Sequence, residues 1–367
     1  MKTIFSGYYG AQNSGDDAFV EVSAWGSKKY WNSSRQLFFA DELPQIITSS
    51  DNYFAHKNYL SFIKAINDIL FCDVFASAGG STFHSALKKT DLRTYAKLKK
   101  NLGFKGKTGA IGISLGPFTN SSAEKSTVEY LKTLDFLALR DKKSFDLANS
   151  YQLPFEPVNA FDLAALLPEI YNYKNDELDI NKKEFVVGIS VCNYESYING
   201  NINKETKRNE FVQNLILKLK KHNNIKFRFF IFNGNAKMGD EKLTMQIIQN
   251  VNSDRDLNYE IIPYQREVKE TFFKIASCDV VLSTRLHASI FACYSNTPFF
   301  LLEYHRKCTD FLEDVGQSDR YRLKDGEVSV GDIVEEIESI LFDRKIFIPS
   351  HVNETIERAR LNFTATY

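Results

Sequence analysis

The chain has 367 residues, which is more than one ordinary hydrophobic core requires, so we expect two domains. Its 46 Lys and Arg residues balance its 46 Asp and Glu residues, and this gives no sign of a nucleic-acid-binding surface. No window approaches the roughly 20 apolar residues of a transmembrane helix, and residues 1–5 run too soon into a glycine turn to form a secretory signal.

The first half alternates short apolar runs with segments of helical periodicity, a pattern typical of a parallel sheet covered on both faces. Strands are predicted at residues 3–8, 37–40, 74–78, 108–114 and 136–139. Helices are predicted at residues 16–30, 59–67, 83–102, 122–131 and 142–150. We therefore expect residues 1–170 to form a Rossmann-like, doubly wound α/β domain.

A polar, aperiodic stretch at residues 171–184 predicts a linker, after which the same alternation starts again. Strands are predicted at residues 185–191, 226–232, 260–262, 280–283 and 299–303. Helices are predicted at residues 207–221, 240–251, 268–277, 286–294 and 308–315. Residues 185–345 are thus expected to form a second Rossmann-like domain facing the first across a cleft, and a helix in residues 346–367 to pack back.

The five cysteines show no spacing typical of a disulfide framework or a zinc site. They lie far apart, mostly in apolar segments, at Cys72, Cys192, Cys278, Cys293 and Cys308. Reduced, buried thiols of a cytosolic protein fit this pattern best.

The most informative segment runs from residue 281 to residue 295. An apolar strand breaks at Ser283-Thr284, and a helical pattern then begins, which puts Arg285 and His287 in the first turn of a helix. The exposed N–H groups and the dipole of a helix start favour an anion, and the guanidinium and imidazole groups add to that preference. The alternative is a surface arginine beside a histidine satisfied within the core.

Two glycine-containing turns in the first half are further candidates for ligand contact. The first contains Gly10, Asn13 and Gly15, with Asp16 placed to cap the next helix. The glycine spacing does not match a dinucleotide fingerprint, and a purely structural turn explains it equally well.

The second turn contains Gly79, Gly80 and Ser81, and it puts His84 in the first turn of the predicted helix 83–102. Arg140 follows a later strand and is expected to extend from the sheet edge, while Asp141 caps the helix that follows. The loop 233–240 also follows a strand; it is expected to be flexible, and its glycine–lysine order is not that of a P-loop.

Several of these segments, in this order, resemble the polysaccharide pyruvyl transferase family. The similar segments are 7–17, 78–81, 112–117, 139–141, 188–190, Arg-Leu-His-Ala at 285–288, the turn 295–298, the strand 299–303 and Lys307. This chain has Ala78 where the family usually has a third glycine, and Glu303-Tyr304-His305-Arg306 where the family commonly has an aspartate. The resemblance extends from about residue 3 to residue 316.

The resemblance implies a GT-B-like fold and a transferase that moves pyruvate from phosphoenolpyruvate onto two sugar hydroxyls, giving a cyclic ketal and phosphate. Arg285 and Arg140 are then expected to bind the donor's carboxylate and phosphate. His287 and His84 are expected to move protons, and Lys307 to stabilise the departing phosphate. The segment Gly79-Gly80-Ser81, with Gly10, Asn13 and Asp16, is assigned to substrate binding, with residues 1–170 on the acceptor side and 185–345 on the donor side.

No metal and no cofactor is expected, since phosphoenolpyruvate serves as a donor substrate. The expected partner is a glycan or lipid-linked glycan of bacterial exopolysaccharide or capsule assembly, in the cytoplasm or at the inner face of the membrane. Two alternatives stay open: a nucleotide-sugar glycosyltransferase, in which Glu303 or Glu313 would bind ribose, and a non-catalytic glycan-binding module.

Overall fold

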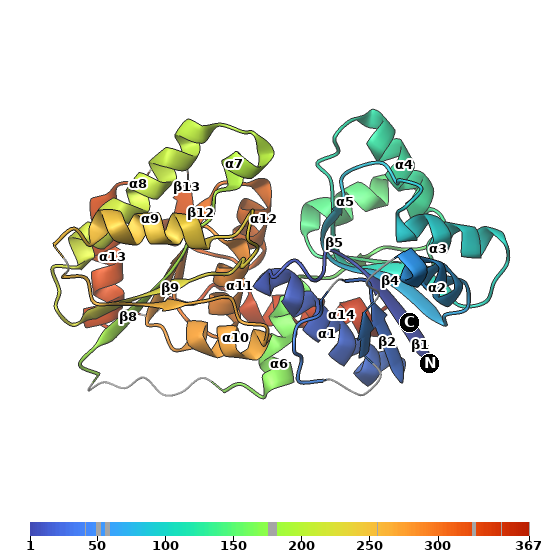
Figure 1. Cartoon of the computed structure of the whole chain (residues 1–367), viewed down its shortest axis with the longest axis horizontal. Coiled ribbons are helices and arrows are strands. Elements are labelled where there is room, and N and C mark those ends of the chain that lie inside the picture. The colour runs from blue at the N-terminus through green and yellow to red at the C-terminus, as the bar shows by residue number, and fades with distance from the viewer. Residues whose placement is uncertain are drawn as a thin grey trace. The chain divides into compact units, whose positions relative to one another are not determined.

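The chain divides into two structural units, each with its own parallel sheet (Figure 1). The computed structural model describes all residues except 41, 49–52, 56–58, 175–181, 255, 325–327, 346 and 367. Unit 1 comprises residues 1–11, 16–170 and 353–367, and unit 2 comprises residues 12–15 and 171–352. Half of the predicted linker, residues 175–181, lies outside the described residues, and the predicted cleft stays a prediction.

Unit 1 contains a seven-stranded sheet in the order β3-β2-β1-β4-β5-β6-β7, with parallel pairing throughout. The strands are β1 (Lys2–Ser6), β2 (Arg35–Phe38), β3 (Tyr53–Ala55), β4 (Val74–Phe83), β5 (Lys107–Leu115), β6 (Phe136–Leu139) and β7 (Val158–Asn159). Strand order reverses direction between β1 and β4, and at such a switch point the loops leaving the two strands diverge and leave room for a ligand.

The helices of unit 1 are α1 (Ser14–Trp31), α2 (Tyr59–Leu70), α3 (Leu92–Asn101), α4 (Ser121–Leu131), α5 (Lys142–Ser150), α6 (Leu167–Tyr171) and α14 (Val352–Thr364). The C-terminal helix α14 packs against α1, where the Trp31 indole donates a hydrogen bond to the Phe363 carbonyl at 3.0 Å. The buried amide of Asn362 binds the Gly112 N–H and the Phe161 carbonyl, so α14 is built into the core of unit 1.

Unit 2 contains a six-stranded parallel sheet in the order β10-β9-β8-β11-β12-β13. The strands are β8 (Phe185–Ser190), β9 (Ile225–Phe230), β10 (Tyr259–Ile262), β11 (Val280–Ser283), β12 (Phe299–Glu303) and β13 (Arg322–Lys324). The helices are α7 (Tyr194–Ile198), α8 (Ile202–Leu219), α9 (Glu241–Val251), α10 (Val268–Ala276), α11 (Leu286–Tyr294), α12 (Arg306–Asp314) and α13 (Val330–Phe342). Every residue of β8 and β11 is buried, which explains their continuous apolar sequences.

One predicted helix is wrong in its first half. Residues 83–102 were expected to be helical, but β4 continues to Phe83, which pairs with Leu115 of β5. The helix α3 begins only at Leu92, where the Asp91 side chain accepts a hydrogen bond from the Arg93 N–H. Pairing with β5 thus outweighs the helical periodicity of this segment.

The buried positions of the cysteines agree with the sequence analysis. All five cysteines are free and buried. Among the residues that the structure describes, no helix is both long and apolar enough to cross a membrane.

Candidate functional site

The turn between β11 and α11 is fixed by hydrogen bonds to the neighbouring strand β8. The Thr284 N–H and hydroxyl both donate to the Ser190 carbonyl, at 2.8 and 3.3 Å. The Ser283 hydroxyl donates to the Arg285 carbonyl at 2.5 Å. Arg285 is therefore held at the N-cap position of α11, and His287 lies in its first turn, as the sequence predicts.

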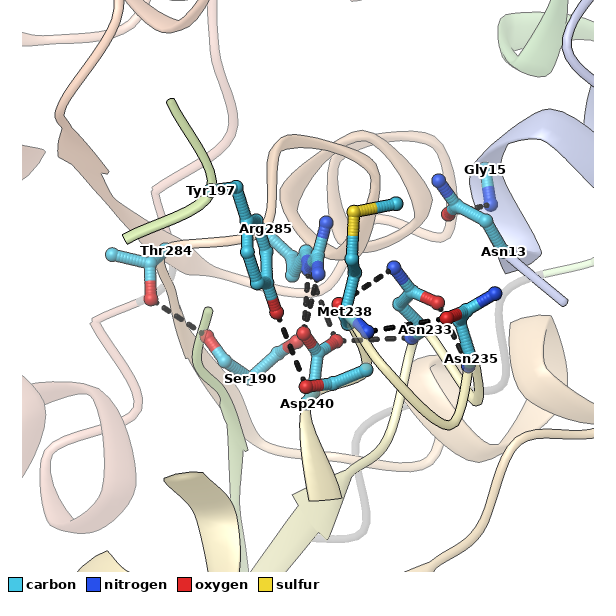
Figure 2. Close-up of polar contacts among 11 residues, drawn as sticks. Asn13, Gly15, Ser190, Tyr197, Asn233, Asn235, Met238, Asp240, Thr284 and Arg285 are labelled. Carbon is cyan, nitrogen blue, oxygen red and sulfur yellow. Dashed lines mark hydrogen bonds and ion pairs between the residues drawn. The ribbon is translucent and has the colours of Figure 1, made fainter. Parts of the chain in front are cut away.

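Arg285 forms an ion pair with Asp240, which the sequence did not single out (Figure 2). Its Nε donates to both carboxylate oxygens at 3.0 Å, and its Nη2 donates to Oδ1. The Asp240 side chain is fully buried, whereas that of Arg285 is 17% exposed. Among the described residues, Nη1 of Arg285 has no protein partner, so one nitrogen of a rigidly held guanidinium is available to an anionic ligand.

The loop 233–240 that carries Asp240 is joined by internal hydrogen bonds, and its expected flexibility stays a prediction. The Asn233 N–H donates to Oδ2 of Asp240, and the Asp240 N–H donates back to the Asn233 carbonyl, both at 2.9 Å. The Asn233 amide donates to the Met238 carbonyl, and the Tyr197 hydroxyl to the Gly239 carbonyl, both at 3.1 Å (Figure 2). These contacts fix the carboxylate that orients Arg285.

The charges around Arg285 keep it protonated. Burial by itself would lower the pKa of Arg285, but the carboxylate of Asp240 opposes burial, and the pKa is raised. Burial raises the pKa of the Cys192 thiol, so this group is neutral near pH 7 and Asp240 is the anion that pairs with Arg285. Burial also raises the pKa of Asp240, and the ion pair with Arg285 opposes that rise.

Lys307 lies close to the same group of charges. It is the second residue of α12, whose start is capped by Nδ1 of His305 accepting from the Lys307 N–H at 3.1 Å. The positive charges of Arg285, Lys307 and Arg208 all lower the pKa of Cys192, against the larger effect of burial. Three cationic side chains thus act electrostatically on Cys192, just after the carboxyl end of β8.

The segment Gln12–Gly15 belongs to unit 2, although the sequence assigned it to the first domain. The Ser14 N–H donates to the Phe232 carbonyl at 2.9 Å, and the Gly234 N–H donates to the Gln12 carbonyl at 2.8 Å. Asn13 forms a β-bridge with Asn233. The amino-terminal glycine turn is therefore hydrogen-bonded to the loop that carries Asp240.

The start of α1 differs from the prediction. The helix begins at Ser14, and the side chain of Asn13 accepts a hydrogen bond from the Gly15 N–H at 3.2 Å (Figure 2). Asp16 is the third residue of the helix and not its cap. Asn13 performs the capping role that was assigned to Asp16.

Gly15 lies directly against the imidazole of His287. A Cβ atom at position 15 would lie 2.2 Å from Nδ1 and 2.4 Å from Cγ of His287. Real Cβ contacts are never this short, so only glycine leaves the ring where it is. The amino-terminal turn thus sets the position of His287 as well as that of the loop 233–240.

In unit 1, Arg140 is buried and fully engaged, so the prediction that it extends freely from the sheet edge is wrong. Its Nε donates to the Ser114 hydroxyl at 2.7 Å, Nη1 to Asp162 at 3.1 Å, and Nη2 to the Ser81 hydroxyl at 3.0 Å. The side chains of Arg140 and Asp162 are 7% and 5% exposed. Arg140 is thus a support for Ser81, while Asp141 caps α5 as predicted.

His84 lies beside Ser81 at the carboxyl end of β4 and not on a helix. Its side chain is exposed, and Nδ1 lies 2.8 Å from the Ser81 carbonyl. A neutral His84 that donates from Nδ1 keeps the lone pair of Nε2 for a proton from solvent or substrate. Arg140, Ser81 and His84 thus form one connected group.

The three glycines assigned to substrate binding in unit 1 have different surroundings. A Cβ at Gly79 would meet the Phe19 ring at 2.3 Å, and a Cβ at Gly10 would meet the Glu42 carbonyl at 2.6 Å, so both are needed for packing. A Cβ at Gly80 would have no neighbour closer than 4.0 Å. Of the three, Gly80 is the one with open space beside its backbone.

Glu303, the proposed ribose ligand of a glycosyltransferase, is already occupied. Arg322 donates to both of its oxygens, at 2.9 and 2.8 Å, and the Thr309 hydroxyl donates at 2.7 Å. The pKa of Glu303 is lowered because these hydrogen bonds outweigh burial. Within the described part of the chain, no three His, Cys, Asp or Glu side chains gather as a metal site.

Comparisons with known proteins agree with both the motifs and the fold. The family model described as polysaccharide pyruvyl transferase matches residues 16–306. No curated protein matches the chain.

Among solved structures, the UDP-GlcNAc 2-epimerase of Methanocaldococcus jannaschii is similar at a TM-score of 0.63 and 12% identity, covering 98% of this chain and 97% of that one. The Neisseria meningitidis UDP-GlcNAc 2-epimerase bound to UDP-GlcNAc is similar at a TM-score of 0.56 and 13% identity, covering 100% of this chain and 97% of that one. The lipopolysaccharide outer core galactosyltransferase WaaB is similar at a TM-score of 0.53 and 10% identity, covering 100% of this chain and 99% of that one. These neighbours establish a GT-B fold.

Proposed function

Because the chain belongs to the polysaccharide pyruvyl transferase family, we propose that it transfers pyruvate from phosphoenolpyruvate to two hydroxyls of a sugar. The acceptor is a surface polysaccharide or its precursor, and the product is a cyclic ketal with release of phosphate. The observation that carries the proposal is the guanidinium of Arg285, held by buried Asp240 at the start of α11. An anion there is favoured by the helix start and by a fixed positive charge.

The donor binds in unit 2. Phosphoenolpyruvate carries a carboxylate and a phosphate on the same carbon atom, C2, and Arg285 and Lys307 supply two separate cations for them. Nη1 of Arg285 binds one anionic group, and Lys307 stabilises the negative charge that develops on the departing phosphate. Arg140 is not part of this donor site, since its three nitrogens are occupied by Ser114, Asp162 and Ser81.

The two histidines move the protons. His287 protonates the methylene carbon, which leaves C2 electrophilic, and a sugar hydroxyl attacks C2 while His84 accepts its proton. The bond from C2 to the phosphate oxygen then breaks, and the second hydroxyl closes the ring. The two sugar hydroxyls release two protons. One balances the proton that forms the methyl group, and the other leaves with phosphate.

The acceptor contacts unit 1, at the carboxyl end of β4. Ser81, His84 and the open backbone at Gly80 supply a hydroxyl, an imidazole and room for a sugar ring. We place the protein in the cytoplasm, with peripheral contact to the inner face of the membrane, because lipid-linked precursors are displayed there.

The direct test combines the protein with phosphoenolpyruvate and a panel of oligosaccharides, and follows both phosphate release and the mass of the product. His84→Gln and His287→Gln are each expected to slow turnover by about 10²–10⁴-fold, the usual contribution of a general acid or base. His351→Gln, at an exposed histidine at the start of α14, serves as the matched control. Transfer from a nucleotide sugar without release of phosphate from phosphoenolpyruvate would contradict the proposal.

A further inference from the structure

Four exposed apolar side chains lie on α2, on α3 and just after these helices in unit 1. Their exposed fractions are 58% for Ile63, 64% for Phe71, 42% for Leu98 and 61% for Leu102. A single exposed apolar side chain is normal on a protein surface. Several of them on one surface indicate an interaction site. We call these four residues the α2/α3 patch.

The geometry of the two helices brings the patch together. The helices α2 and α3 pack side by side (Figure 1), and Leu98 and Leu102 are four residues apart on one face of α3 and its end. The ring of Phe71 meets that of Phe104 edge to face, with centroids 5.3 Å apart. Phe104 is joined to the end of α3 through its N–H, which donates to the Lys99 carbonyl at 3.1 Å.

Positive charge surrounds the patch. Residues 97–107 contain five lysines and no acidic residue. Lys99 is buried against the Cys72 carbonyl, and Lys100 pairs with Asp135. Lys64 and Lys105 are exposed, and Lys97 is half-exposed; each lies within three residues of a patch residue in the sequence.

We propose that the α2/α3 patch binds the surface of an anionic phospholipid bilayer. Apolar side chains enter the boundary between headgroups and acyl chains, and lysines around them are attracted to anionic headgroups. Apolar insertion and electrostatic attraction are each too weak for stable binding, and this surface supplies both. The lysines of residues 97–107 thus acquire a function.

The patch is remote from the residues proposed for catalysis in unit 1. Phe71 precedes β4 and Leu102 precedes β5, so the patch lies at the amino ends of these parallel strands. Gly80, Ser81 and His84 lie at or beyond the carboxyl end of β4. Substitutions in the patch therefore leave the proposed chemistry intact, and membrane binding can be tested independently of it.

The experiment is co-sedimentation of the full chain with vesicles of phosphatidylcholine, with and without phosphatidylglycerol. Binding is expected with the anionic vesicles and is expected to weaken as salt is added. Phe71→Ser and Leu102→Ser should each weaken binding about tenfold, from the loss of apolar contact. Lys97→Gln and Lys105→Gln should each weaken it about fivefold, and only with anionic vesicles.

The controls are Ile348→Ser, at a side chain that is 45% exposed in unit 2, and Lys237→Gln, at an exposed lysine of the loop 233–240. Neither should change vesicle binding. Absence of binding by the wild-type protein would overturn the proposal, as would binding that the patch variants leave unchanged. A dimer in solution that Phe71→Ser and Leu102→Ser convert to monomer would assign the patch to self-association and overturn it as well.

Discussion

Replacing Asp240 by alanine is expected to lower the free energy of unfolding by about 3–5 kcal/mol, the usual effect of leaving one member of a buried ion pair without its partner. Asp240 is fully buried, and its carboxylate accepts from Arg285 and from the Asn233 N–H. The variant therefore leaves a mostly buried guanidinium unpaired and loosens the loop 233–240. Chemical denaturation followed by circular dichroism measures the loss.

A matched control compares this destabilisation with the effect of removing an exposed aspartate. Asp254 is 77% exposed and lies 3.8 Å from Lys220, so Asp254→Ala should change stability by at most about 1 kcal/mol. The double variant Asp240→Ala/Arg285→Ala should recover part of the loss, because it removes both charges. An Asp240→Ala protein as stable as the Asp254→Ala protein would show that the pair does not form.

Replacing Gly15 by alanine is expected to displace His287 and to reduce turnover by at least about tenfold while the protein stays folded. The new Cβ would overlap the imidazole, at 2.2 Å from Nδ1, so either the ring or the helix start must move. Overpacking of this kind costs about 1–3 kcal/mol. A proton transfer that depends on ring position is more sensitive than stability to such a shift. Turnover measured beside thermal unfolding distinguishes the two effects.

Gly331→Ala is the matched control for this substitution. Gly331 also lies near a helix start in unit 2, but a Cβ there would meet the Ser329 hydroxyl at an ordinary 3.4 Å. This variant should retain full turnover. If Gly15→Ala behaves like Gly331→Ala, the amino-terminal turn does not position His287.

Much of the architecture is predictable from the sequence, because buried parallel strands and amphipathic helices leave clear patterns. Both doubly wound halves, the break at Ser283-Thr284 and the helix that begins at Leu286 are in place. The short edge strands β3, β7 and β13 were missed, since two or three residues carry no periodicity. The helix α13 was also missed, although its sequence is amphipathic.

The partners of the predicted residues could not be predicted, because they depend on strand order. Asp240 follows β9 and Arg285 follows β11, and these strands are neighbours of β8 on its two sides. The sequence places Asp240 at the start of the predicted helix 240–251; only the sheet order reveals it as a partner for Arg285. The attachment of Gln12–Gly15 to unit 2 is likewise a tertiary contact without a local signal.

His84 and Arg140 show a second limit. A helical pattern predicted His84 on a helix. Strand pairing between Phe83 and Leu115 instead extends β4 up to Phe83, the residue before His84. Arg140 follows a strand as expected, yet each of its three nitrogens already donates to Asp162 or to one of two serines. An arginine at a strand end is a weaker ligand-binding candidate when all three of its nitrogens already donate to protein groups.

The most direct test of pyruvyl transfer is thermal unfolding with phosphoenolpyruvate, compared with UDP-GlcNAc, on the wild-type protein, Arg285→Lys and Lys307→Gln. Lysine at position 285 keeps a charge near Asp240 and avoids the instability of an alanine there, but it lacks the guanidinium fork. Ligand at about one hundred times its dissociation constant stabilises the site by about 2.7 kcal/mol, or about 5–11 °C for a unit of this size. We predict this shift with phosphoenolpyruvate in the wild type, and a smaller shift in both variants. A shift with UDP-GlcNAc and none with phosphoenolpyruvate would contradict the account.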